Sequence, residues 1–279
     1  MNTENDALGN RMKGYEGIFD NKTMPLLPVI ARLDGKCFHT FTKGLARPYD
    51  VRLSVIMSCL TELLVEDTNA LVGYTQSDEI TLIWYSDNTN SQIYFDGRVS
   101  KINSILPAKA SILFNDLIKY NIPEKASQMA LFDCRVWYVP NKTEAVNTLV
   151  WRELDATKNA ISMAAQSYFS PKELLGKNGS QKQEMIYSKG FNFNDYPTFF
   201  KRGVYFAKRI KEKKFTIAEL DKLPAKHEAR TNPDLVVKRS VVEKLDLPPI
   251  TKIVNREAVF FDGAEPIGID NTKKYSKID

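Results

Sequence analysis

Apolar runs alternate with polar turns along the first half of the chain, and their spacing predicts a strand followed by a helix. The apolar run at residues 26–33 ends abruptly at Asp34 and Gly35, which is typical of a buried strand that meets a tight turn. Asp50 is a suitable N-cap for a helix, because the apolar residues from 53 to 64 recur at helical spacing after it.

A hairpin, a second helix and another strand follow. Two strand-like runs flank a polar, acidic tip, which is the pattern of a β-hairpin. The predicted elements are strands at 70–74 and 80–85, a helix at 97–120 that Pro107 kinks or interrupts, and a strand at 130–139. The order β-α-β-β-α-β predicts a split ferredoxin-like unit and an α+β fold class. Beyond residue 140 the pattern predicts a mixed, mainly helical C-terminal extension.

The composition is that of an ordinary globular protein. The chain has 279 residues, of which 43% are hydrophobic and 26% are charged. This balance excludes a disordered, collagen-like or coiled-coil chain. The formal net charge of +5 permits an anionic partner without requiring one.

Cysteine and histidine usage narrows the chemistry. Cys37, Cys59 and Cys134 have no paired spacing, which argues against an exported disulfide framework and for a reducing compartment. With two histidines in the chain, a His-rich zinc site is nearly excluded. No apolar run approaches the roughly 18 residues that span a bilayer, so we expect a cytoplasmic protein that does not use a membrane.

Two acidic turns are expected to converge at one edge of the predicted sheet. In a β-α-β-β-α-β unit the first and third strands are neighbours, so Asp34 and Asp78 should lie close together. Two adjacent carboxylates repel each other unless a cation lies between them, and hard oxygen ligands favour Mg²⁺. The pair therefore predicts a two-metal site for phosphoryl or nucleotidyl transfer. Singly, an Asp-Gly turn and an acidic hairpin tip are more often solvated turns; together on this frame they favour catalysis.

Basic and flexible residues near these turns suit a phosphorylated ligand. Gly35 lets the backbone N–H groups that follow it approach a triphosphate. Arg98 and Lys101, near the start of the second helix, share one face; they either bind phosphates or form a solvated helix start. A basic and aromatic run at 201–214 either contacts RNA or forms a solvated face beside a short strand at 204–206.

Short motifs surround these turns and continue into the second half of the chain. They are RLDGKCFH at 32–39, ARPYD at 46–50, GYTQSDE at 73–79, FDCRV at 132–136, the Trp151-Arg152 pair and KQE at 182–184. In this order they closely resemble the motifs of the tRNA-His guanylyltransferase family, over about residues 8 to 215. That family adds nucleotides to the 5′ end of tRNA in the 3′-to-5′ direction, on a fold similar to the palm of ordinary polymerases.

The resemblance implies a catalytic centre and a set of ligands. Asp34, the Gly35 carbonyl and Asp78 would ligate Mg²⁺, and Glu79 would support these catalytic acids. A nucleoside triphosphate, ATP or GTP, would contact Asp34, Gly35, Lys36, Cys37, Phe38, His39, Arg47, Asp50, Ser77, Asp78, Arg98 and Lys101. Phosphates or the tRNA would contact Arg135, Arg152, Lys158, Asn159 and Lys182. Arg47 stands where many members have Lys, which keeps the charge and changes its geometry.

One segment departs from the family pattern. Eukaryotic members specific for tRNA-His carry His-Ile-Asn-Asn-Leu-Tyr-Asn shortly after the Trp-Arg pair, where this chain has Thr157-Lys158-Asn159-Ala160-Ile161-Ser162-Met163. Without that histidine, the chain resembles the branch found in bacteria, archaea and viruses. That branch resembles a templated repair polymerase for 5′-truncated tRNAs, so strict specificity for tRNA-His is not expected.

The sequence therefore predicts a Mg²⁺-dependent nucleotidyltransferase that extends tRNA 5′ ends, by tRNA-His guanylylation or by templated 5′-end repair. A palm-like nucleotide cyclase and a non-catalytic RNA-binding module are the alternatives. Residues 1–140 are expected to form the palm-like catalytic domain, and residues 141–279 to serve tRNA and subunit contacts. The resemblance also implies a homotetramer built as a dimer of dimers.

Overall fold

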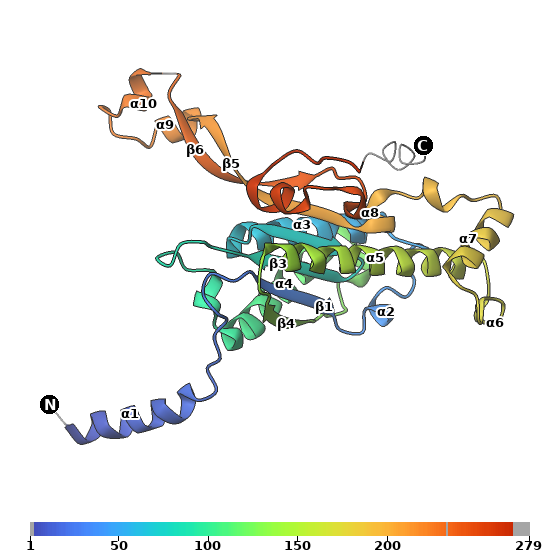
Figure 1. Ribbon diagram of the computed structural model, residues 1–279, viewed down its shortest axis with the longest axis horizontal. Helices are drawn as coiled ribbons and strands as arrows, with labels where there is room; N and C mark the ends of the chain where they lie inside the picture. Colours follow the sequence, from blue (N-terminus) through green and yellow to red (C-terminus); the bar gives the residue numbers. More distant parts are fainter. Residues whose placement is uncertain (1–2, 233, 270–279) are drawn as a thin grey trace, which may run out of the picture.

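The computed structural model describes residues 3–232 and 234–269 and contains a six-stranded antiparallel sheet with helices on both faces (Figure 1). Up to residue 138 the elements are α1 (Thr3–Gly17), β1 (Val29–Gly35), α2 (Phe38–Phe41), α3 (Val51–Thr68), β2 (Val72–Gln76), β3 (Glu79–Trp84), α4 (Val99–Asn121) and β4 (Phe132–Tyr138). After it come α5 (Lys142–Gln166), α6 (Pro171–Leu174), α7 (Gly179–Ser188), α8 (Thr198–Arg202), β5 (Val204–Lys214), α9 (Ile217–Leu220), α10 (Glu228–Thr231) and β6 (Val236–Leu245). The predicted α+β class is confirmed.

The strands lie in the order β4-β1-β3-β2-β5-β6. The predicted neighbours β1 and β3 pair antiparallel, from Val29 opposite Trp84 to Asp34 opposite Glu79. The end of β1 therefore lies beside the β2–β3 turn. This register fixes which polar residues meet at that edge of the sheet.

In the central strands β1, β2 and β3 both faces are largely buried, and side chains that alternate along each strand pack into two different cores. On β1, Val29, Ala31 and Leu33 pack in one core with α3 and α4. Ile30 packs in a second core with α5 and with the segment from 250 to 260. Arg32 and Asp34 follow the same alternation as Ile30, which directs them to the face that α5 covers.

Several boundaries differ from the sequence pattern. β1 begins at Val29 and continues through Asp34 and Gly35, where the pattern predicted the turn. α4 runs without interruption through Pro107. α5 begins at Lys142, at the start of the portion predicted to be mainly helical, and is capped by the Asn141 side chain, which accepts from the Glu144 N–H at 2.8 Å.

The sheet continues past residue 140, because β5 pairs with β2 and β6 pairs with β5. The strand expected around 204–206 extends to Lys214. Its first four residues, 204–207, are buried, whereas residues 210–214 are exposed. The distal part of the β5–β6 hairpin, with α9 and α10, projects from the body, and α1 extends away from the other side (Figure 1). None of the helices within 3–232 and 234–269 has both the length and the apolar character needed to cross a membrane.

Candidate nucleotide-binding and catalytic site

The two predicted acidic turns meet at the end of β1. Asp34 lies opposite Glu79 in the β1–β3 register, and the Gly35 N–H donates to the Asp78 carbonyl at 3.1 Å. The tip of the hairpin is Ser77-Asp78, with Ser77 in the left-handed region at φ 51°. The sequence-based prediction that Asp34 and Asp78 lie close together at one edge of the sheet is confirmed, with Asp34 on β1 and Asp78 in the β2–β3 turn.

The environment of this edge disfavours the charged form of Asp78. Burial raises the pKa of Asp78, and the charge of Asp34 raises it further. Hard oxygen donors and a half-buried pair of carboxylates suit a divalent cation, which would balance the negative charge at this edge. Within the described ranges, no three Asp, Glu, His or Cys side chains form a metal cluster, so a cation here would draw on two carboxylates and on backbone or substrate oxygens.

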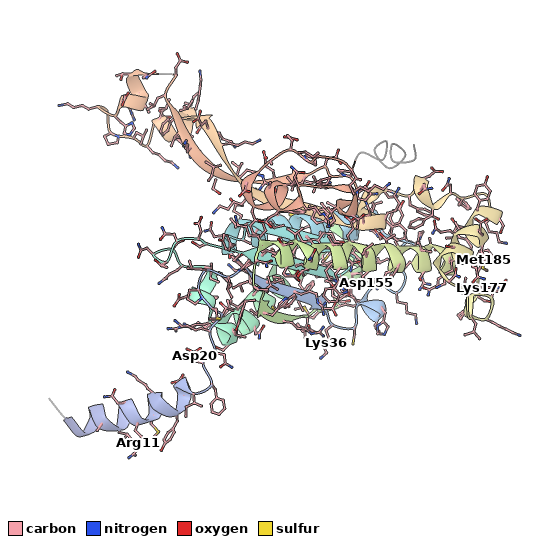
Figure 2. The ribbon with its side chains drawn as sticks, in the orientation of Figure 1. Arg11, Asp20, Lys36, Asp155, Lys177 and Met185 are labelled. Carbon is pink, nitrogen blue, oxygen red and sulfur yellow. The ribbon has the colours of Figure 1, made fainter. Side chains whose placement is uncertain are left out.

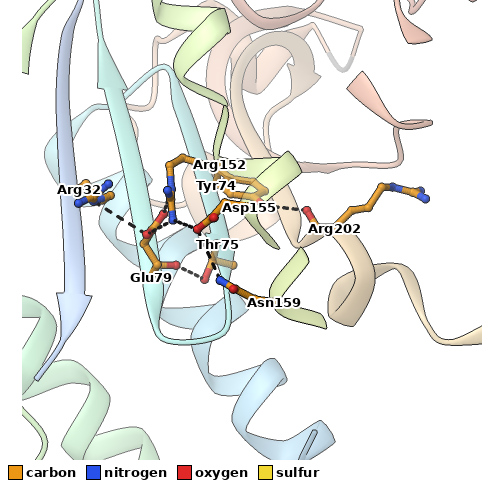
Figure 3. Close-up of polar contacts among 8 residues, drawn as sticks. All are labelled: Arg32, Tyr74, Thr75, Glu79, Arg152, Asp155, Asn159 and Arg202. Atoms are coloured by element: carbon orange, nitrogen blue, oxygen red, sulfur yellow. Dashed lines mark hydrogen bonds and ion pairs between the residues drawn. The ribbon is translucent and has the colours of Figure 1, made fainter. Parts of the chain in front are cut away.

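Glu79 is held by arginine beside this pair. Arg152 Nε and Nη2 donate to the two Glu79 carboxylate oxygens at 2.6 Å each, and Arg32 Nε lies 3.9 Å from Glu79 (Figure 3). Arg152 also donates to Asp155 at 3.1 Å. Burial raises the pKa of Glu79 despite the lowering effect of Arg152. Glu79 and Arg152 thus form a buried bidentate ion pair behind the acidic edge.

A cavity of about 490 Å³ lies on one side of the hairpin tip. It brings together eight of the residues predicted to bind a nucleotide, namely Gly35, Cys37, Phe38, His39, Arg47, Asp50, Ser77 and Asp78. Leu45 and Leu53 add apolar surface, and Met163 and Gln166 close it from α5. Its size and mixed lining suit a nucleotide.

Asp50 has a structural task in this wall. As the predicted N-cap of α3 it accepts from the Arg52 N–H at 3.0 Å, and its other oxygen accepts from Arg52 Nη2 at 2.9 Å. These bonds to Arg52 hold the pKa of Asp50 below its ordinary value. The Ala46 N–H also points to Asp50, at 3.5 Å, so this carboxylate ties the loop that carries Arg47 to the start of the helix.

A second cavity, of about 600 Å³, runs along α5 on the other side of Asp78. We call it the α5 groove; it is lined by Arg32, Asp34, Gln76, Ser77, Asp78, Glu79, Trp151, Arg152, Asn159, Ser162, Met163 and Gln166. Four residues, Ser77, Asp78, Met163 and Gln166, line both cavities. The two cavities therefore adjoin at the hairpin tip, with Asp78 common to both and Asp34 in the wall of the α5 groove.

The remaining predicted residues lie in different places. Lys182 Nζ donates to Ser162 Oγ at 3.1 Å, which brings α7 to the rim of the α5 groove. Arg135 on β4 lies opposite Arg32. Lys36, just after β1, and Asp155, on α5, are labelled at this end of the sheet in Figure 2. Lys158 is exposed on α5.

Arg98 and Lys101 lie at the opposite end of the sheet. They begin α4, which follows the end of β3 where Trp84 pairs with Val29. Arg98 forms an isolated bridge with Lys22, ahead of β1. In a single chain, neither Arg98 nor Lys101 lines the cavity beside the hairpin tip or the α5 groove.

The α5 contribution is the part of the site that sequence reasoning did not assemble. Trp151, Met163 and Gln166 line the groove, but no role was predicted for them. Asn159, Ser162 and Gln166 recur at three- and four-residue spacing, so they share a helix face with Arg152. This helical spacing, counted from the Trp151-Arg152 pair, is the sequence signal that could have identified these residues.

Fold and site together define a mixed α and β protein with two adjoining cavities that share the Asp78 carboxylate, an arrangement suited to phosphorylated ligands. The model of a family described as tRNAHis guanylyltransferase (Thg1) matches residues 9–140. The tRNA(His) guanylyltransferase of Schizosaccharomyces pombe is 26% identical over 240 residues, which cover 76% of this chain and 87% of that protein.

Solved structures agree with this match. A bacterial tRNA(His) guanylyltransferase (Thg1)-like protein in complex with ATP is 36% identical, with a TM-score of 0.67, and the match covers 72% of this chain and 87% of that one. A second, in complex with GTP, is 30% identical with a TM-score of 0.68, over 88% of this chain and 94% of that one. The chain belongs to the tRNA(His) guanylyltransferase family.

Proposed function

We propose that this protein is a Mg²⁺-dependent nucleotidyltransferase that adds nucleotides, GTP among them, to the 5′ end of tRNA in the 3′-to-5′ direction. The observation that carries the proposal is the pair of cavities that share Asp78, with Asp34 in the wall of the α5 groove, in a chain of this family. The solved relatives bind ATP and GTP, which supports nucleoside triphosphates as substrates. The reaction would serve tRNA-His guanylylation or templated 5′-end repair.

The cavities suggest a division of labour. The triphosphate would lie in the cavity beside Gly35 to His39, with Arg47 near its phosphates, and the RNA end in the α5 groove. Asp34, Asp78 and the Gly35 carbonyl would hold Mg²⁺, which would neutralise charge on the reacting phosphates. Glu79 would support this centre by fixing Arg152. The β-α-β-β-α-β frame of residues 29–138 would then correspond to a polymerase palm.

Two steps make up the proposed chemistry. An oxygen of the RNA 5′-monophosphate attacks the α-phosphorus of ATP and pyrophosphate leaves, which gives an adenylylated 5′ end. The 3′-hydroxyl of the incoming nucleotide then attacks the 5′-phosphate, its proton is lost to solvent, and AMP leaves as a phosphodiester forms. The protein's part is to align these groups between the two cavities.

Larger-scale expectations extend the proposal. Residues 1–140 would carry the catalytic centre, and residues 141–279 would supply tRNA and subunit contacts as well as the α5 wall of the site. A cytoplasmic homotetramer, a dimer of dimers, is the expected assembly. It would explain a role for Arg98 and Lys101, which could reach a nucleotide bound by another subunit. Light scattering after size exclusion tests the assembly, and a monomer at working concentration would contradict it.

The direct test is 5′-end extension. We would incubate the protein with Mg²⁺, ATP, GTP and a 5′-truncated tRNA and measure lengthening at the 5′ end. Asp78→Asn should abolish extension, whereas Asp116→Asn, on the exposed face of α4, should leave it unchanged. Product from a free triphosphate alone would instead indicate a cyclase. Tight RNA binding without Mg²⁺-dependent chemistry would indicate a binding module.

A further inference from the structure

Trp151 differs from the other two tryptophans of the chain. Trp84 is 2% exposed in the core, and Trp137 packs partly buried beside α5. Trp151 is 51% exposed and lines the α5 groove. A half-exposed indole in the wall of a polar groove is an unusual use of a residue that otherwise gains so much from burial.

The Trp151 ring is held in place by two arginines. The Arg152 guanidinium carbon lies 4.6 Å from the ring centroid, and that of Arg32 lies 5.4 Å from it. Arg152 is itself fixed by Glu79 and Asp155. The ion pair behind the acidic edge thus also orients an aromatic side chain that keeps half of its surface open.

We propose that Trp151 is a stacking platform for the terminal base of the RNA at its reacting 5′ end. The inference rests on the proposed function and names the subsite that holds the RNA. Aromatic rings bind unpaired or terminal bases through their π faces, with little sequence preference, and nearby guanidinium groups favour the adjoining phosphates.

The geometry favours the RNA over the triphosphate as the partner of Trp151. Trp151 lines the α5 groove together with Arg32 and Arg152, and none of these three lines the cavity beside Gly35 to His39. A base on Trp151 would leave that cavity available to the incoming nucleotide. The Trp151 contact should therefore act on RNA affinity and leave nucleotide affinity unchanged.

Variants can separate stacking from simple coverage of Arg152. Trp151→Leu keeps an apolar cover over the guanidinium but has no π face, whereas Trp151→Phe keeps a smaller π face. The control is Tyr120→Ala, which removes a remote aromatic side chain that is 81% exposed. We expect Trp151→Leu to raise the KM for 5′-truncated tRNA roughly tenfold, the size of one lost base stack. Trp151→Phe should restore most of it, Tyr120→Ala should match the wild type, and the KM for GTP should stay constant throughout. An unchanged KM for tRNA in Trp151→Leu, or an equal rise in both KM values, would overturn the inference.

Binding without chemistry tests the contact separately from the proposed reaction. In EDTA without nucleotide, truncated tRNA should quench the tryptophan fluorescence of the wild type, and Trp151→Phe should lose most of that quenching. Quenching of equal size in both proteins contradicts the stacking role. A wild type that shows the Trp151-dependent quenching but never extends the tRNA would refute the proposed function and leave the stacking contact standing.

Discussion

Gly35 has no side chain where the ring of Phe38 crosses the end of β1. A Cβ at this position would have three Phe38 ring atoms within 2.7 Å. The ring cannot retreat easily, because it packs against Phe41, Phe114 and Phe132 with centroids 5.2 to 5.3 Å away. The absence of a Cβ at Gly35 thus lets Phe38 pack in the core and also leaves the turn open to a ligand.

Gly35→Ala is expected to lower the free energy of unfolding by about 1–3 kcal/mol, the usual cost of overpacking a core. Nucleotide binding should weaken as well, because the Phe38 wall moves. Urea denaturation measures the first effect and ATP titration the second. Gly14→Ala, in a helix where a Cβ meets nothing within 4 Å, is the matched control and should not destabilise the protein. An equally stable Gly35→Ala would contradict the packing argument.

The Glu79–Arg152 pair is a second feature at the residue scale. Both side chains are 7% exposed, so removing one partner strands a buried charge. Arg152→Met should therefore destabilise the fold by about 3–5 kcal/mol. Adding Glu79→Gln to that variant should recover part of the loss, because the buried carboxylate that Arg152 neutralised is then removed. Urea denaturation of both single variants and the double variant measures the interaction free energy between Glu79 and Arg152. If the loss in the double variant equals the sum of the two single losses, the two side chains do not stabilise each other.

At the scale of elements, α5 connects the site to the rest of the sheet. One face of the helix lines the groove, and Glu153 points the other way, where it accepts from Tyr205 Oη on β5 and from the Ile250 N–H, both at 3.0 Å. A buried acid here was not predictable from sequence, because its partners lie 52 and 97 residues away. The periodicity of α5 was visible, but not its tertiary contacts.

Glu153 gives the stability a pH dependence. Burial raises its pKa above the ordinary 4.5, outweighing the two hydrogen bonds that lower it. The folded state therefore holds this proton more tightly than the unfolded state, so the contribution of Glu153 is complete below pH 4.5 and is lost as pH rises through its folded pKa. Glu153→Gln should remove this loss. Above pH 4.5 the free energy of unfolding of this variant should therefore rise relative to that of the wild type.

Tyr205→Phe should change the pH dependence of stability in the opposite direction to Glu153→Gln. It deletes a hydrogen bond to the ionised carboxylate and so should raise the pKa of Glu153 further, which means that the decline of stability should continue to higher pH than in the wild type. Urea denaturation at pH 4, 5, 6 and 7 compares the three proteins. Parallel curves for the wild type and Glu153→Gln would show that Glu153 does not cause the effect.

At the scale of the whole molecule, one sheet joins the two halves of the sequence. The first four strands in chain order and the meeting of Asp34 with Asp78 could be predicted, because apolar runs, turn residues and one familiar order of elements fix them. The β2–β5 pairing could not, because the apolar part of β5 is short and is followed by exposed charged residues. Of the α5 wall of the site, the family resemblance implied Arg152 and Asn159, but Trp151, Met163 and Gln166 were missed for a related reason: helix periodicity does not say which strand edge a helix face will meet.

The projecting part of the β5–β6 hairpin offers a test of how charge is distributed over the molecule. Residues 211–239 contain eight Lys and Arg against five Asp and Glu by count from the sequence, a net +3. Some of this charge is paired, since Lys214 Nζ lies 2.7 Å from Asp234 and Arg239 Nη1 lies 2.6 Å from Glu219. No residue of this segment belongs to the three buried core clusters of the described chain. The body of the protein should therefore fold without it.

Replacing 211–239 by Asn-Gly would join Ile210 to Ser240, which lie opposite each other in the β5–β6 register. We expect this variant to melt within a few degrees of the wild type and to bind ATP normally. If the hairpin contacts RNA phosphates, tRNA affinity should fall, and the slope of log K against log salt should become shallower by about 0.9 for each contact removed. Filter binding from 50 to 300 mM NaCl measures that slope. An unchanged slope would assign the phosphate contacts to the body, where Arg32 lines the α5 groove and Lys182 contacts Ser162 at its rim, and would make the distal hairpin a solvated projection.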